Sequence, residues 1–156
     1  MQTALHVVQY LKGTINLNLL YSANAYLSLQ AYSDAHWGPC EFTSRSLIGY
    51  CMLLGTSLIS WKIKKEKIVS KSSCELEYHN IFHATSELVM LEGLPADLKV
   101  HIPQPILLHC DNKSAVQIVA NPFYHERTKH LRIDCCYIRA SVASGFIHTP
   151  YTKTSL

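Results

Sequence analysis

Alternating hydrophobic and polar residues from Tyr26 to Trp37 predict a β-strand with one buried face. We expect this strand to end at Asp34. A second hydrophobic run, Ile106 to Cys110, stops at Asp111 and leads into a helical pattern. Because ligands of open α/β sheets bind at the carboxyl ends of the strands, these two acids can meet at one site.

The rest of the chain shows patterns typical of helices and of further strands. Helical periodicity predicts helices over Met1 to Leu11, from Ser72 to near Gly93 and Pro95, over Asn112 to Asn121 and over Glu126 to Ser144. Strands are predicted over Leu17 to Tyr21, Leu47 to Leu54, Ser57 to Ile63 and Phe146 to Tyr151, with a tight hairpin turn at Gly55 and Thr56. This order predicts an α/β domain with a mixed sheet, its antiparallel part first and its parallel part later.

A third acid lies near the start of the helix that follows Ser72. Ser72 and Glu75 fit a capping box, in which each side chain bonds the other residue's backbone. Glu77 follows within the first two turns, one residue from the inward hydrophobic stripe. A carboxylate near a helix N-terminus also has a simple explanation in the helix dipole, but Glu75 fits that explanation better than Glu77.

Composition favours one well-packed domain. The 156 residues are 48% hydrophobic and 16% charged, which is enough to fill a sizeable core. The formal net charge of +3 permits a polyanionic partner without requiring one. No stretch approaches the length of a membrane span and no signal peptide is evident, so we expect an intracellular, cytoplasmic protein without a membrane partner.

Lysines are concentrated between Trp61 and Lys71. This segment contains five of them, Lys62, Lys64, Lys65, Lys67 and Lys71. One interpretation is a solvated strand edge on which lysines prevent edge-to-edge pairing. The other is a rim that contacts the phosphates of a nucleic acid.

The three acids Asp34, Glu77 and Asp111 offer the oxygen ligands that Mg²⁺ prefers. Two such ions about 3.5 to 4 Å apart can activate a water and stabilise the leaving oxygen of a phosphodiester. Acids at strand ends also occur without any catalytic role, so the pattern alone leaves both interpretations open.

Several longer phrases resemble the ribonuclease H region of the Pol polyprotein of copia-type LTR retrotransposons. They include AYSDAHWG, SSCELEY, CDNKSA, NPFYHERTKH and the closing IHTPYTKTS. The phrases occur in order, at the spacing of that family, and the resemblance covers nearly the whole chain. It implies a ribonuclease H-like mixed five-stranded sheet with flanking helices.

The resemblance also implies an activity. Ribonucleases H are metal-dependent endonucleases that cleave the RNA strand of RNA·DNA hybrids, here during reverse transcription. Carried over to this sequence, Asp34, Glu77 and Asp111 would be catalytic and would bind two Mg²⁺ or Mn²⁺ ions. Expected partners are the hybrid itself and the reverse transcriptase portion of the polyprotein, within a virus-like particle in intact relatives.

Further residues are candidates for contact with the nucleic acid. The predicted contacts are Lys62, Lys64, Lys65, Lys71, Asn112, Arg127 and Lys129. His125 and His130 fall in the segment where ribonucleases H often place a mobile histidine loop. They are therefore candidates for a mobile histidine near the scissile phosphate.

Two departures from the family pattern concern acidic residues. The family's fourth carboxylate lies in a LAD phrase beyond the position matching Thr152 to Ser155, and this sequence ends at Leu156. We therefore expect a weakened second metal site. His36 stands where relatives usually have a second aspartate.

These departures shape the expected domains and an alternative function. We expect a connection-like helix and short strand over residues 1–25, and a ribonuclease H-like domain over 26–156 that stops before its last helix. The alternative function is a catalytically inactive retroelement remnant that is at most a weak hybrid-binding module.

A zinc site is an alternative interpretation of the H-x4-H-x4-CC pattern formed by His125, His130, Cys135 and Cys136. Structural zinc sites usually space their cysteines two to four residues apart, and adjacent cysteines on one helix point in different directions. We therefore expect no zinc there.

Overall fold

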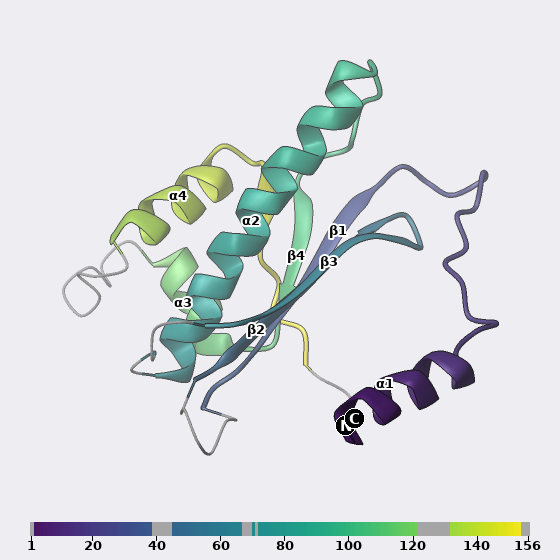
Figure 1. Ribbon diagram of the computed structural model, residues 1–156. Helices are drawn as coiled ribbons and strands as arrows, with labels where there is room; N and C mark the ends of the chain where they lie inside the picture. Colours follow the sequence, from purple (N-terminus) through teal and green to yellow (C-terminus); the bar gives the residue numbers. More distant parts are fainter. Residues whose placement is uncertain (1, 39–44, 67–69, 71, 122–131, 154–156) are drawn as a thin grey trace.

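The computed structural model describes residues 2–38, 45–66, 70, 72–121 and 132–153 of the protein. Its centre is a five-stranded sheet with the strand order β3-β2-β1-β4-β5 (Figure 1). The strands are β1 (Leu29–His36), β2 (Leu47–Leu54), β3 (Ser57–Lys65), β4 (Ile106–Cys110) and β5 (Ile147–His148). The helices are α1 (Gln2–Gly13), α2 (Ser73–Asp97), α3 (Lys113–Ala120) and α4 (Arg132–Ala143).

The sheet is mixed, as predicted. Strand β1 pairs antiparallel with β2 and parallel with β4, while β4 and β5 are parallel. The β2–β3 hairpin turns at Gly55, whose φ of +61° is a conformation that side chains other than glycine rarely adopt. A Cβ there would lie 2.6 Å from the carbonyl oxygen of Tyr26, so this turn requires glycine.

Helices α2, α3 and α4 lie on one face of the sheet and enclose the hydrophobic core (Figure 1). Ala31 and Met52 contribute from the sheet, Ile81 and Leu88 from α2, and Ile138 from α4, all fully buried. The hydrophobic alternation in the strands therefore marks the face that the helices cover. On the opposite face, large side chains such as Tyr32, Trp61 and Ile63 are exposed.

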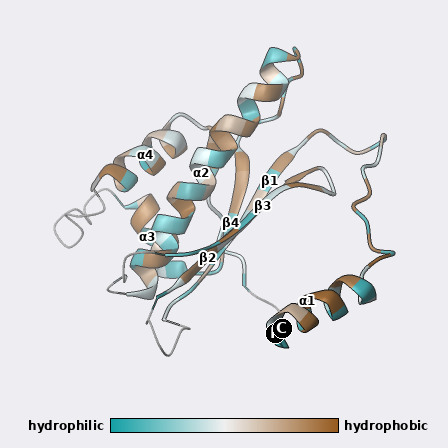
Figure 2. Ribbon diagram, viewed as in Figure 1, coloured by the Kyte–Doolittle hydropathy of each residue, from teal (hydrophilic) through white to brown (hydrophobic). Residues whose placement is uncertain are grey.

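Helix α1 stands apart from the sheet (Figure 1) and has no buried residue. Its hydrophobic side chains Leu5, Val8 and Leu11 are exposed. Figure 2 shows brown, hydrophobic stretches along the ribbon of this helix. In the described part of the chain, no helix is both long and apolar enough to span a bilayer.

Several predicted elements differ from the structure. The predicted strand over Leu17 to Tyr21 does not form, and β1 runs two residues beyond Asp34. The final strand has only two residues, followed by an isolated bridge between Cys110 and Tyr151. Of the helix predicted from Glu126, the described residues show the part beginning at Arg132.

Helix α2 begins as predicted and ends later than predicted. Ser72 is its N-cap, and its hydroxyl accepts a hydrogen bond from the backbone N–H of Glu75. The helix continues through Pro95 to Asp97. It closes where Lys99 adopts a φ of +59° and the N–H of Val100 donates to the carbonyl of Pro95 at 2.8 Å, an arrangement that satisfies helix-terminal carbonyls.

Candidate active site

Asp34, Glu77 and Asp111 come from three different elements. Asp34 is an exposed residue of β1, paired with Gly49 of β2. Asp111 directly follows β4, the parallel neighbour of β1. Glu77 lies early in α2 on the side that faces the sheet, and only 4% of its surface is exposed.

The carboxylate of Glu77 is fixed against the end of β1. Its Oε1 accepts a hydrogen bond of 3.1 Å from the backbone N–H of Ala35. Burial raises the pKa of Glu77 to about 8, the Ala35 hydrogen bond opposes this shift, and the negative charges of Asp111 and Asp34 add to it. The three acids therefore interact electrostatically, and a cation between them would relieve the repulsion.

Cys110 completes a compact set of donor atoms. Oxygens of Glu77 and Asp111 and the sulfur of Cys110 all lie within 4.8 Å of one another. Burial raises the pKa of the Cys110 thiol to about 12, so the sulfur stays protonated and the effective ligands are oxygens. Oxygen ligands suit hard cations such as Mg²⁺ and Mn²⁺.

The backbone beside Asp34 is held by Asn80, a residue that sequence patterns did not single out. Asn80 is fully buried in α2, and its Nδ2 donates hydrogen bonds of 2.9 Å to the backbone carbonyls of Asp34 and Gly49. The amide therefore links α2 to β1 and β2 one turn beyond Glu77.

A cavity of about 530 Å³ opens beside the acids on the exposed face of the sheet. Asp34 and Asp111 line it together with Lys62 and Lys153, while Glu77 is not among its lining residues. The cavity wall includes the aromatic rings of Tyr32, Trp61 and His109; the rings of Tyr32 and His109 stack with centroids 4.6 Å apart. Acidic, basic and aromatic side chains thus line the same cavity.

The predicted nucleic-acid contacts occupy varied positions. Lys62 lines the cavity, and Lys65 ends β3. Lys64 lies 3.3 Å from the Glu66 carboxylate. Asn112 is the N-cap of α3, because its Oδ1 accepts a hydrogen bond from the N–H of Ala115. Lys71, Arg127, Lys129, His125 and His130 lie outside the described residues.

The chain is similar to a segment of long polyproteins. No family model matches the chain. It is 36% identical over 154 residues to the retrovirus-related Pol polyprotein from transposon RE1 of Arabidopsis thaliana, a match that covers 99% of this chain and 10% of the polyprotein. The corresponding polyprotein from transposon TNT 1-94 of Nicotiana tabacum is 29% identical over 87% of the chain and 10% of the polyprotein. The chain thus spans about a tenth of these relatives.

Solved structures share the fold. LC11-RNase H1, solved in complex with an RNA/DNA hybrid, aligns with a TM-score of 0.56 and 11% identity, over 81% of this chain and 85% of that one. The N-terminal RNase H domain of a Mycobacterium tuberculosis protein aligns with a TM-score of 0.54 and 12% identity, over 81% and 83%. The chain therefore matches the ribonuclease H region of a Pol polyprotein of copia-type transposons, and its mixed sheet has the ribonuclease H-like fold.

Proposed function

We propose that this chain is a metal-dependent nuclease of the ribonuclease H type that cleaves the RNA strand of RNA·DNA hybrids. The observation that carries the proposal is the electrostatic coupling of three acids, seen in the pKa of Glu77, which Asp111 and Asp34 both raise. Buried, mutually repelling carboxylates are typical of sites that bind cations or transfer protons.

The donor set fits a hard divalent cation. Asp34, Glu77 and Asp111 would hold Mg²⁺ or Mn²⁺. Glu77 and Asp111 have donor atoms close to each other and to the uncharged thiol of Cys110, and Asp34 acts on Glu77 through its charge. Such an ion would supply an activated water and charge stabilisation at the scissile phosphate. The protein's own contribution is to fix the acids: Ala35 orients Glu77 and Asn80 anchors the backbone of Asp34.

The cavity beside the acids supports a polyanionic substrate. Lys62 and Lys153 lie on its wall, where they can contact phosphates flanking the cleaved bond. The exposed ring of Trp61 offers a surface against which a sugar or base can pack. Among the structural neighbours, LC11-RNase H1 was solved with an RNA/DNA hybrid, and the curated relatives are Pol polyproteins, which supports a role in reverse transcription.

The proposal is tested with purified protein and a hybrid in which either strand carries the label. We expect cleavage of the RNA strand in Mg²⁺ or Mn²⁺ and none in EDTA. Asp34→Asn and Asp111→Asn should each lower the rate at least about 100-fold, because each removes a negative ligand from the ion. The matched control is Asp97→Asn, which makes the same change at an exposed position at the end of α2.

Each outcome has a clear meaning. Loss of cleavage in the two site variants but not in Asp97→Asn supports the proposal. A folded wild-type protein that binds the hybrid without cutting it supports the alternative of a binding module. Cleavage of both strands, or of DNA duplexes at an equal rate, contradicts the proposed selectivity for RNA.

A further inference from the structure

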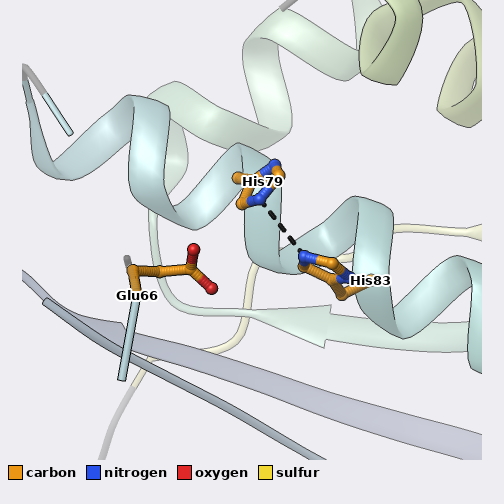
Figure 3. A group of neighbouring side chains, drawn as sticks. All are labelled: Glu66, His79 and His83. Atoms are coloured by element: carbon orange, nitrogen blue, oxygen red, sulfur yellow. Dashed lines mark hydrogen bonds between the residues drawn. The ribbon is translucent and has the colours of Figure 1, made fainter. Parts of the chain in front are cut away.

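A second group of metal-ligating side chains lies outside the three acids. It consists of Glu66, in the segment after β3, and His79 and His83 of α2. One donor atom from each residue lies within 4.8 Å of the others. Figure 3 shows both imidazoles projecting from α2, with the Glu66 carboxylate extending toward them from the neighbouring segment.

The two histidines are placed on one face of the helix. Their spacing of four residues puts the side chains one turn apart, which is the spacing that allows two histidines on a helix to bind one metal ion. Their Nε2 atoms face each other at 3.2 Å. Two nitrogen ligands of a tetrahedral zinc ion with Zn–N distances of about 2.0 to 2.1 Å lie roughly 3.3 Å apart. The observed separation therefore fits a shared ion with little movement.

Asp134 of α4 orients the first histidine. Its Oδ2 lies 2.8 Å from Nδ1 of His79, so Nδ1 donates to this carboxylate and Nε2 is the nitrogen that faces His83. Metal-binding histidines commonly donate their second nitrogen to a carboxylate in this way, which fixes the tautomer and strengthens the ligand. The contact with Asp134 is thus the arrangement that a zinc-binding imidazole requires.

Glu66 supplies an independent indication, because its buried carboxylate lies beside a cationic side chain that solvent reaches. Only 7% of its surface is exposed, and its Oε1 is buried without a hydrogen bond. The ammonium group of Lys64 lies 3.3 Å from this oxygen, but 40% of the Lys64 side chain is exposed. Lysine can therefore move into solvent when a cation takes its place.

We propose that Glu66, His79 and His83 bind one divalent transition-metal ion, with Zn²⁺ as the expected ion and Asp134 as a positioning residue. The His₂Glu set matches the preferences of zinc and leaves one coordination position for water. Two imidazoles make this site softer than the carboxylate site at Asp34, so the two sites select different ions. The proposal does not depend on the proposed nuclease activity.

The ion would join three parts of the fold. Glu66 follows the edge strand β3, the histidines belong to α2, and Asp134 reaches in from α4. We therefore expect the metal to act as a structural clamp between the end of β3 and the helical layer. This site uses none of the residues of the H-x4-H-x4-CC pattern considered from the sequence.

The site is tested by titrating the full chain with Co²⁺ and with Zn²⁺ in the presence of excess Mg²⁺. Co²⁺ reports coordination through its visible absorption, and Zn²⁺ affinity is measured by competition with a chromophoric chelator. We expect one ion per chain and a higher thermal midpoint with Zn²⁺. His83→Ala and Glu66→Gln should each weaken binding at least about tenfold, and Asp134→Asn by about 10- to 100-fold. Lys64→Gln should strengthen binding, because it removes a competing cation.

Controls separate this site from other histidines and acids. His148→Ala changes an exposed histidine of β5 and should leave binding unchanged. Circular dichroism without metal shows whether each variant folds, and Glu66→Gln keeps the shape of the side chain if His83→Ala does not fold. The proposal is overturned if the chain binds no Zn²⁺ at micromolar concentration. It is equally overturned if Asp111→Asn abolishes binding while folded His83→Ala and Glu66→Gln do not affect it.

Discussion

The carboxylate of Glu77 lies where solvent reaches it poorly, between the N–H of Ala35 and the acid of Asp111. Burial is the largest cause of its raised pKa, and the neighbouring negative charges add to it. Without a cation, the folded protein therefore favours the protonated acid. The same position that suits a metal ligand is unfavourable for an unpaired charge.

This position predicts a pH-dependent stability in EDTA. The pKa of Glu77 rises from 4.5 to about 8 on folding. Stability from this group is thus fully present below pH 4.5 and is lost as the pH rises through 8. Glu77→Gln cannot titrate, so between about pH 5 and pH 9 its free energy of unfolding should fall less than that of the wild type.

Urea unfolding at several pH values measures this difference. Glu92→Gln, a substitution in the same helix, controls for the loss of an acid in general. Parallel pH curves for the wild type and Glu77→Gln would show that the buried carboxylate is not destabilised.

The position of a site residue could be predicted from the sequence where it depends on a single strand or helix. The strand ending at Cys110 is confirmed, and with it the place of Asp111. Asn80 was missed because its amide bonds carbonyls from two strands, a role that no local pattern shows. His79 and His83 have a visible four-residue spacing, but only the fold brings Glu66 to them.

Among the elements, α2 carries the most information about the site and shows where local rules fail. Its first half carries Glu77 and Asn80 against the sheet. The sequence predicts that the helix ends near Gly93 and Pro95, earlier than it does. The reason for this prediction is that proline lacks an N–H and its ring crowds the preceding turn. Pro95 lies in the last turn, and the helix ends two residues later at Asp97, so only a short piece of helix follows the disrupted hydrogen bond.

Pro95→Ala should therefore stabilise the protein. The substitution restores an N–H donor toward the carbonyl of Leu91 and removes the steric conflict of the ring. We expect the free energy of unfolding to rise by about 1 to 3 kcal/mol, at most the cost of a proline in a helix interior. Equilibrium unfolding in urea measures the change.

Gly93→Ala provides the comparison for this prediction. A Cβ at Gly93 meets no atom within 4 Å, so alanine there makes no new contact. Its higher helix propensity alone should raise the free energy of unfolding by about 0.5 to 1 kcal/mol. A Pro95→Ala protein no more stable than the wild type would mean that the last turn contributes nothing to folding.

The segment from Leu17 to Tyr21 shows why a β-rich pattern alone is insufficient. Its contacts with β3 use side chains: Ser57 Oγ donates to the carbonyl of Leu20, and the hydroxyl of Tyr21 donates to the carbonyl of Leu58. A strand needs a partner for its backbone ladder, and no sequence pattern identifies that partner.

For the molecule as a whole, the two faces of the sheet have different roles. Three helices cover one face, whereas the other carries the cavity with Asp34, Asp111 and exposed aromatic rings. The mixed α/β architecture was predictable because the order of elements restricts the topology. Of the two lysines that line the cavity, only Lys62 was predictable, because it belongs to a run of lysines in the sequence. Lys153 is isolated in the sequence.

Hybrid binding should depend on salt through these lysines. We expect Lys62→Gln and Lys153→Gln, each in an Asp111→Asn background that prevents cleavage, to weaken binding. Each should reduce the slope of log affinity against log salt by about 1, because one phosphate contact is lost. Fluorescence anisotropy at several salt concentrations measures the slope.

Lys99→Gln is the control, since Lys99 lies just beyond the end of α2 and outside the cavity lining. Slopes that stay equal in all three variants would place the nucleic acid on another surface.

The pairing of β1 with β4 also has a consequence for the newly made chain. Strands β1, β2 and β3 are neighbours in sequence and can assemble from local contacts, whereas Ser33 meets His109 across 76 residues. Closing such a long loop is slower than forming hairpins. During synthesis, Asp34 and Glu77 leave the ribosome before Asp111, so the three acids come together only once β4 has been inserted beside β1.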